Sequence, residues 1–170
     1  CPDYLHSGSS GTPDLRKVEI FCSHVIEHYD GKDIYFEFTG GEVTRWKQFP
    51  QLVDYLKSHD NVYVGVISNG SSSLEWWLSM KDKLDHACVS FQPEVSKKEH
   101  YIEVVKLIRE YMRTHVNLMM HPNYFHECLE VVEEIVESIP NISIALQPLF
   151  IEFKDTLYKY TDEQLEIIDQ

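Results

Sequence analysis

Five short segments rich in apolar, β-branched and aromatic residues recur along the chain, at residues 34–38, 62–67, 87–91, 116–120 and 142–146. Their starts are spaced by about 25–29 residues, which is the length of a strand, a helix and two loops. The pattern therefore predicts five strands with a helix before each of the later ones.

Helical spacing of apolar residues, at i, i+3, i+4 and i+7, fills the intervals between these segments. It is clearest in three sets: Phe49, Leu52, Val53 and Leu56; Tyr101, Val104, Val105, Ile108 and Met112; and Phe125, Cys128, Leu129, Val132, Ile135, Val136 and Ile139. A further helix precedes the first strand, with Val18, Phe21, Cys22, Val25 and Tyr29 on its predicted buried side. The weakest pattern follows Ser73, where Trp76, Trp77 and Met80 supply the apolar face.

Two helix starts carry capping-box spacing, in which two side chains satisfy each other's free backbone N–H groups. Ser96 stands three residues before Glu99, and Thr161 stands three residues before Gln164. The second pair predicts a short last helix near the C-terminus.

Alternation of strands and helices predicts an α/β fold with a parallel sheet, because each helix returns the chain to restart in the same direction. Either an open doubly wound sheet or a partial barrel fits this pattern, and periodicity does not separate them. In both, function concentrates in the loops at the carboxyl ends of the strands.

Composition is that of one ordinary folded domain: 170 residues, 43% of them apolar. The net charge of −13 opposes binding to nucleic acid or to a membrane surface. We find no apolar run long enough to span a bilayer and no signal-peptide pattern, so we expect a cytoplasmic protein. The four cysteines are too few and too widely spaced for a disulfide scaffold, which suits a reducing compartment.

Small and polar residues follow the predicted strands and mark the candidate site. They are Thr39-Gly40-Gly41-Glu42, Ser68-Asn69-Gly70-Ser71, Ser90-Phe91-Gln92-Pro93-Glu94, Met120-His121-Pro122 and Gln147-Pro148. The double glycine permits close approach of a ligand to the backbone, and Glu42 could accept hydrogen bonds from an ammonium group. Equally, the glycines could form only a tight turn, with Glu42 as a helix N-terminal acid.

The order of these motifs resembles the radical S-adenosylmethionine (radical SAM) family over about residues 1–150. Phe38-Thr39-Gly40-Gly41-Glu42 matches the Gly-Gly-Glu motif that ends the family's second barrel strand. Cys1 matches the last cysteine of the family's Cys-x3-Cys-x2-Cys loop, and Leu5-His6-Ser7-Gly8-Ser9 resembles a segment after that loop. The resemblance implies a partial (β/α)6-type TIM-like barrel lacking its first strand, followed by an extension over residues 151–170.

Similarity to this family also implies cofactors, a 4Fe-4S cluster and S-adenosylmethionine (SAM), and a reaction. In the family the cluster reductively cleaves SAM to a 5′-deoxyadenosyl radical, which abstracts hydrogen from a substrate. By resemblance, Cys1 is a cluster ligand, and Gly40, Gly41 and Glu42 face the methionine amino group. Ser90, with Ser68 or Asn69, would bind the ribose or carboxylate, and Gln147 would line the adenine or substrate side.

This sequence departs from the family pattern in two ways. Val43 stands where proline often follows Gly-Gly-Glu, and the first strand and two cluster cysteines are absent, so we expect a fragment cut within the cluster motif. One thiolate does not replace three, so the chain alone should hold no stable cluster. The substrate stays open among small molecules, sugars and peptides, and the expected electron donor is a flavodoxin or ferredoxin. The catalytic residues are not identified.

Other residues favour structural interpretations. Cys22, Cys88 and Cys128 are expected in the core, the histidines show no HExxH-type zinc pattern, and Trp76-Trp77 is expected to pack. Two alternatives to the radical SAM interpretation remain. One is a cluster-free doubly wound α/β enzyme, although neither G-x-G-x-x-G nor a P-loop is present; the other is a non-catalytic binding or scaffold domain.

Overall fold

The computed structural model describes residues 12–151 and 155–169. Its elements in chain order are α2 (Leu15–His28), β1 (Ile34–Phe38), η1 (Val43–Arg45), α3 (Phe49–Leu56), β2 (Val62–Ser68), α4 (Leu74–Ser79), β3 (His86–Phe91), α5 (Lys98–Arg109), β4 (Arg113–Met119), η2 (Pro122–Tyr124), α6 (Phe125–Ser138), β5 (Ser143–Gln147) and α7 (Asp162–Ile168). The five predicted strands and their helices are all present.

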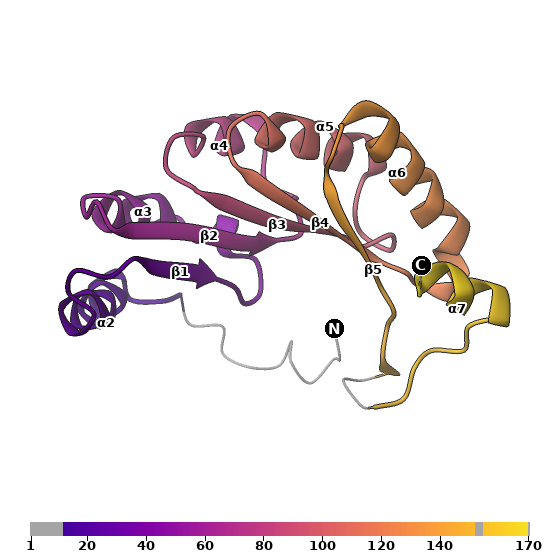
Figure 1. The fold of residues 1–170 in the computed structure, drawn as a ribbon, viewed down its shortest axis with the longest axis horizontal. Helices are drawn as coiled ribbons and strands as arrows, with labels where there is room; N and C mark the ends of the chain where they lie inside the picture. Colours follow the sequence, from indigo (N-terminus) through magenta and orange to yellow (C-terminus); the bar gives the residue numbers. More distant parts are fainter. Residues whose placement is uncertain (1–11, 152–154, 170) are drawn as a thin grey trace.

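All neighbouring strands pair in parallel, in the order β1-β2-β3-β4-β5. Right-handed crossovers that always step in the same direction put their helices on one face of a sheet, and α4, α5 and α6 lie on one side of the curved sheet in Figure 1. A doubly wound sheet reverses its strand order and carries helices on both faces. The sequential order therefore excludes that alternative and leaves a partial barrel.

Strand β4 begins at Arg113, earlier than the apolar run at 116–120 predicts. Its first residues alternate between exposed Arg113, buried Thr114 and half-buried His115. Because none of these three residues is apolar, a search for hydrophobic segments misses this part of the strand.

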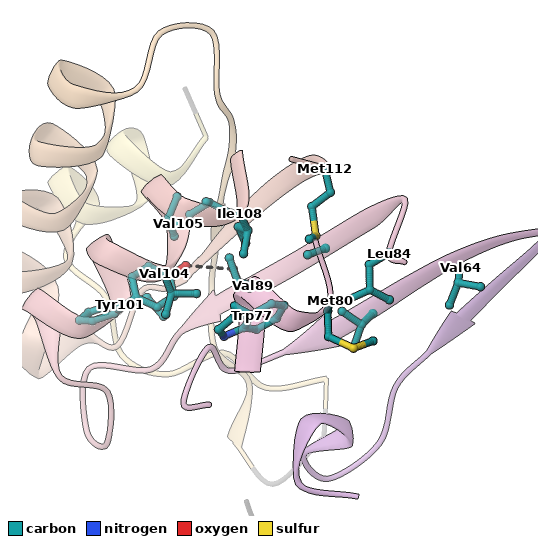
Figure 2. Close-up of a cluster of buried hydrophobic side chains, with 14 of the residues drawn as sticks. Val64, Trp77, Met80, Leu84, Val89, Tyr101, Val104, Val105, Ile108 and Met112 are labelled. Atoms are coloured by element: carbon teal, nitrogen blue, oxygen red, sulfur yellow. Dashed lines mark hydrogen bonds between the residues drawn. The ribbon is translucent and has the colours of Figure 1, made fainter. Parts of the chain in front are cut away.

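The hydrophobic core lies between the sheet and its helices (Figure 2). Trp77 from α4 and Tyr101 from α5 are among its largest fully buried side chains, and Val89 of β3 is also fully buried. The hydroxyl of Tyr101 donates to the carbonyl oxygen of Val89 at 3.0 Å, the dashed line of Figure 2. Packing by Trp77 confirms the structural interpretation of the tryptophan pair.

Some predicted positions are wrong. Phe21 and Tyr29 of the first helical pattern are 64% and 46% exposed, and Val136 of α6 is 57% exposed. In α2, Cys22 is the one fully buried residue, since this helix lies at the β1 edge and covers a narrow part of the sheet.

The two predicted capping boxes have different outcomes. Ser96 does not cap α5: its hydroxyl accepts from the backbone N–H of Gln92, and the N-cap residue is Lys97, whose side chain makes no capping bond. The reciprocal bonds of Thr161 and Gln164 at α7 confirm the second box.

The chain after β5 packs back onto the barrel. The hydroxyl of Tyr160 donates to the carbonyl oxygen of Met120 at 2.7 Å and accepts from the N–H of Leu149 at 2.8 Å. Within the described parts of the chain, no helix has the length and apolar character needed to cross a membrane.

Candidate functional site at the carboxyl ends of the strands

The carboxylate of Glu42 joins the loops that follow β1 and β2. Within its own loop, Oε1 accepts from the N–H of Thr44 at 3.1 Å and from its hydroxyl at 2.7 Å. From the next loop, the Ser68 hydroxyl donates to Oε1 at 2.9 Å, and the Asn69 N–H donates to Oε2 at 2.8 Å. The structure thus brings together Glu42, Ser68 and Asn69, three of the predicted site residues.

Ser68 and Asn69 are held by further local bonds. Ser68 is 4% exposed, and its hydroxyl accepts from the N–H of Gly70 at 3.0 Å. The side-chain oxygen of Asn69 accepts from the N–H of Ser71 at 2.9 Å, an Asx turn. Gly70 has φ +71°, a conformation that favours glycine. This loop is therefore shaped by its own sequence.

The double glycine is open to a ligand. Gly40 has φ +123°, which side chains rarely adopt, and an added Cβ at either Gly40 or Gly41 would meet no atom of residues 12–151 and 155–169 within 4 Å. Backbone with free space beside it, next to a fixed carboxylate, fits the binding of a polar group such as the amino acid end of SAM.

Hydrogen bonds continue from Glu42 to three residues that sequence reasoning missed. The hydroxyl of Ser72 donates to the hydroxyl of Thr44, and Nε2 of His100 lies 3.0 Å from the carbonyl oxygen of Ser72. The network links the loops after β1 and β2 to α5. Nothing in the local sequence marks these residues, because their contacts cross between loops far apart in the chain.

Ser90 and Gln147 lie apart from this cluster. The side chain of Val89 belongs to the core under the helices, so Ser90 as the next residue projects from the opposite, concave face. Ser90 is 7% exposed. Gln147 is exposed at the end of β5, three strand positions from β2. The site residues thus spread around the rim.

The concave face also carries a polar network that sequence reasoning missed. Nδ1 of His115 lies 2.7 Å from the Ser143 hydroxyl, and its Nε2 lies 3.0 Å from Oδ1 of Asn117. The amide of Asn117 donates to the sulfur of Cys88 at 3.2 Å. The signal was present in the sequence: polar residues at every second position of β3 and β4 indicate one polar strand face.

A cavity of about 1340 Å³ lies over this face, toward the amino ends of the strands, and both Cys88 and His115 line it. Cys22 and Cys128 belong to the hydrophobic core as predicted, whereas Cys88 is buried outside that cluster. Burial raises the pKa of all three thiols, to about 11 for Cys22 and Cys128.

Cys1, the predicted cluster ligand, lies outside the described residues, as does the Leu5 to Ser9 segment. Across residues 12–151 and 155–169, no group of three or more His, Cys, Asp or Glu side chains could hold a metal ion.

Comparison with solved structures decides the fold. The chain is similar to SuiB of Streptococcus suis, with a TM-score of 0.65 and 15% identity over 95% of this chain and 40% of that one. It is also similar to spore photoproduct lyase complexed with dinucleoside spore photoproduct, with a TM-score of 0.60 and 8% identity over 92% and 61%. Both neighbours are radical SAM enzymes. The chain shares the α/β barrel fold of these structures.

A spore photoproduct lyase variant solved with bound AdoMet and the dinucleoside photoproduct gives a TM-score of 0.57 at 8% identity, over 92% of this chain and 50% of that one. No family model and no curated protein matches the chain. The chain spans about 60% or less of the solved structures it resembles. At these identities the likeness confirms the predicted partial barrel, and function is a separate question.

Proposed function

We propose that this chain is the barrel core of a radical SAM enzyme. One observation carries the proposal: the Gly40-Gly41-Glu42 motif is bonded to Ser68 and Asn69 at the carboxyl ends of adjacent parallel strands. This is the end of a β/α barrel where active sites lie. The fold is shared with an enzyme that was solved with bound AdoMet, which supports the same ligand here.

In this proposal the residues of the chain bind and orient SAM. The open backbone at Gly40 and Gly41, with Glu42 beside it, receives the methionine amino group. Ser90 on the concave face and Asn69 at the rim supply hydrogen bonds to the ribose or carboxylate, and Gln147 borders the adenine or substrate. When bound, the reduced 4Fe-4S cluster and SAM supply the radical chemistry, while the barrel excludes water and competing hydrogen donors.

Cys1 supplies one thiolate of the cluster in this proposal, and a flavodoxin or ferredoxin supplies the electron. The substrate enters from the concave side. Ser90 and Asn117 are register partners on that face toward the carboxyl ends of β3 and β4, so a hydrogen-bonding substrate suits it better than a hydrocarbon. A small molecule, a sugar and a peptide all meet that description.

The test is formation of 5′-deoxyadenosine. The protein encoded by the complete reading frame is purified without oxygen, reconstituted with iron and sulfide, reduced with dithionite and incubated with SAM. We expect 5′-deoxyadenosine from the wild type and a loss of at least about tenfold in Cys1→Ala, with Cys22→Ala as the matched control. A loaded protein that cleaves no SAM would contradict the proposal and favour a non-catalytic binding or scaffold domain.

A further inference from the structure

We propose that the cavity toward the amino ends of the strands binds the oxyanion group of a small molecule, a carboxylate or a phosphate, through the guanidinium group of Arg113 and the imidazole ring of His86. The cavity lies at the opposite end of the strands from Glu42 and the double glycine. Binding there is therefore independent of the function proposed above, and its tests need neither SAM nor a cluster.

This cavity has polar walls where the interior of a β/α barrel is usually apolar. The inward-facing layers of such barrels consist mainly of branched apolar side chains. Here His86, Cys88, Arg113 and His115 alternate along β3 and β4 with residues that face the helices, and all four line the cavity of about 1340 Å³. Polar side chains around an open space suit a polar ligand.

Arg113 and His86 stand side by side on the concave face. They are register partners in the pairing of β3 with β4, and neighbouring strands lie about 4.8 Å apart. Arg113 is exposed, and its side chain makes no ion pair within residues 12–151 and 155–169. A guanidinium group carries five N–H donors in a planar fork that matches carboxylate and phosphate oxygens. The donors of Arg113 are therefore available to such a ligand.

The ring of His86 adds a second donor. Its Nδ1 lies 3.0 Å from the Tyr35 hydroxyl and 3.5 Å from Oε1 of Glu37, so both protein partners of the ring are at one nitrogen. Nε2 has no partner in the described part of the chain and is open to solvent. In the protonated ring both nitrogens donate, Nδ1 toward Tyr35 and Glu37 and Nε2 into the cavity. Protonated His86 beside Arg113 thus gives two cationic donors for one oxyanion.

Acids around the cavity leave the charge of Arg113 uncompensated. Asp85 is held by Lys57 at 2.9 Å and also accepts from the N–H of Val64. Glu37 lies beside Nδ1 of His86, on β1, three strands from Arg113. The other charged residues that line the cavity lie outside the strands: Lys81, Asp82, Arg109 and Glu110.

Binding of an anion should be stronger in mild acid, because His86 titrates there. The titratable and charged groups around its ring are Tyr35 and Glu37 on β1, Asp85 before β3, Cys88 on β3, and Arg113 and His115 on β4. Burial lowers the pKa of His86, Arg113 and His115 act in the same direction, and Glu37 opposes them. A bound anion offsets the charge of Arg113, so the pKa of His86 is higher in the complex. Affinity for acetate, which stays ionised, should therefore rise about fivefold from pH 8 to pH 6.

An NMR titration measures binding at the histidine ring directly. Inorganic phosphate and acetate are added in separate experiments to the full-length protein at pH 6, and the ring signals of His86 are followed. The reference is His126, whose side chain is 90% exposed. We expect shifts at His86 that saturate with a dissociation constant of about 1 mM or tighter, and the anion that binds more tightly identifies the head group. No response of His86 to either anion would overturn the proposal.

Substitutions at Arg113 test the guanidinium group. Arg113→Gln should weaken binding about tenfold, the loss of a charge-assisted hydrogen bond. Arg113→Lys keeps the charge without the fork and should weaken binding less, about threefold. The matched control is Arg16→Gln, which removes the same charge from an exposed position of α2 that does not line the cavity, and should bind as the wild type does. Wild-type affinity in Arg113→Gln, with its fold checked by circular dichroism, would show that the anion binds elsewhere and overturn the proposal.

His86→Gln tests the imidazole ring. It should lower the affinity for acetate at pH 6 about fivefold and leave the same affinity at pH 6 and pH 8, since the group that takes up the proton is gone. A wild-type dependence on pH in His86→Gln would assign the proton to another group, such as His115, and overturn the role of His86.

Discussion

The hydroxyl of Tyr35 lies 3.0 Å from Nδ1 of His86, although these residues stand on β1 and β3 with β2 between them. Gly65 of β2 makes the contact possible. A Cβ at Gly65 would collide with the Tyr35 hydroxyl and lie 2.9 Å from Cζ of its ring. The missing side chain therefore lets a tyrosine reach across the central strand on the concave face.

Gly65→Ala should consequently be destabilising, by about 1 kcal/mol, because Tyr35 must move and its bond to His86 is lost. In a Tyr35→Ala background the same change should be stabilising by about 0.5–1 kcal/mol, since alanine restricts the unfolded chain and nothing remains to collide with. Urea denaturation of the four proteins in this cycle measures the coupling.

Tyr63→Ala is the control for this cycle, because the three atoms nearest to a Cβ at Gly65 belong to Tyr35 and His86 and none belongs to Tyr63. Gly65→Ala should have its wild-type effect in that background. Equal effects of Gly65→Ala with and without Tyr35 would contradict the proposed contact.

His86 makes the stability of the fold sensitive to mild acid. Burial lowers the pKa of His86 below its ordinary value of 6.5, and Arg113 and His115 act in the same direction, while Glu37 opposes them. The unfolded state then binds the proton more readily than the native state. Stability should therefore fall as pH drops through 6.5 toward the native pKa, and be unaffected by this group at higher pH.

His86→Gln should reduce the loss of stability between pH 7 and pH 5, measured by urea denaturation at several pH values. The control is His126→Gln, because the side chain of His126 is 90% exposed. If both variants show the wild-type slope, His86 does not contribute in the way described.

Helices, strands and their order could be predicted because they follow from periodicity, as Phe49, Leu52 and Leu56 illustrate. Alternation also marks a polar face on β3 and β4, but the contacts within that face, such as Asn117 with Cys88, follow only from the register in which the strands pair. Glu42 could be selected as a site residue from its neighbours in the sequence. Its bonds to Ser68 and Asn69 depend on how the next loop sits, and no local pattern encodes that.

Cys22 and Cys128 should react slowly with iodoacetamide in the folded protein. Burial raises their thiol pKa values to about 11, so at pH 8 roughly one molecule in a thousand carries the thiolate, against about one in four for a free cysteine. We expect modification at least about a hundredfold slower than in urea, measured by peptide mass spectrometry. Modification of Cys22 at the unfolded rate would show that α2 does not pack against the core through this residue.

Gly40 and Gly41 should respond differently to alanine, although both face open space. Gly40 has φ +123°, so Gly40→Ala should cost about 1–3 kcal/mol in backbone strain and lower the thermal unfolding midpoint of the free protein. Gly41 does not have a positive φ, so Gly41→Ala should change stability by less than about 0.5 kcal/mol. If SAM approaches this backbone closely, Gly41→Ala should nevertheless weaken SAM binding, because the new methyl group occupies space that the ligand needs. Thermal unfolding and SAM affinity measured together separate the two effects, and a Gly41→Ala protein with wild-type affinity would show that the ligand does not contact the turn there.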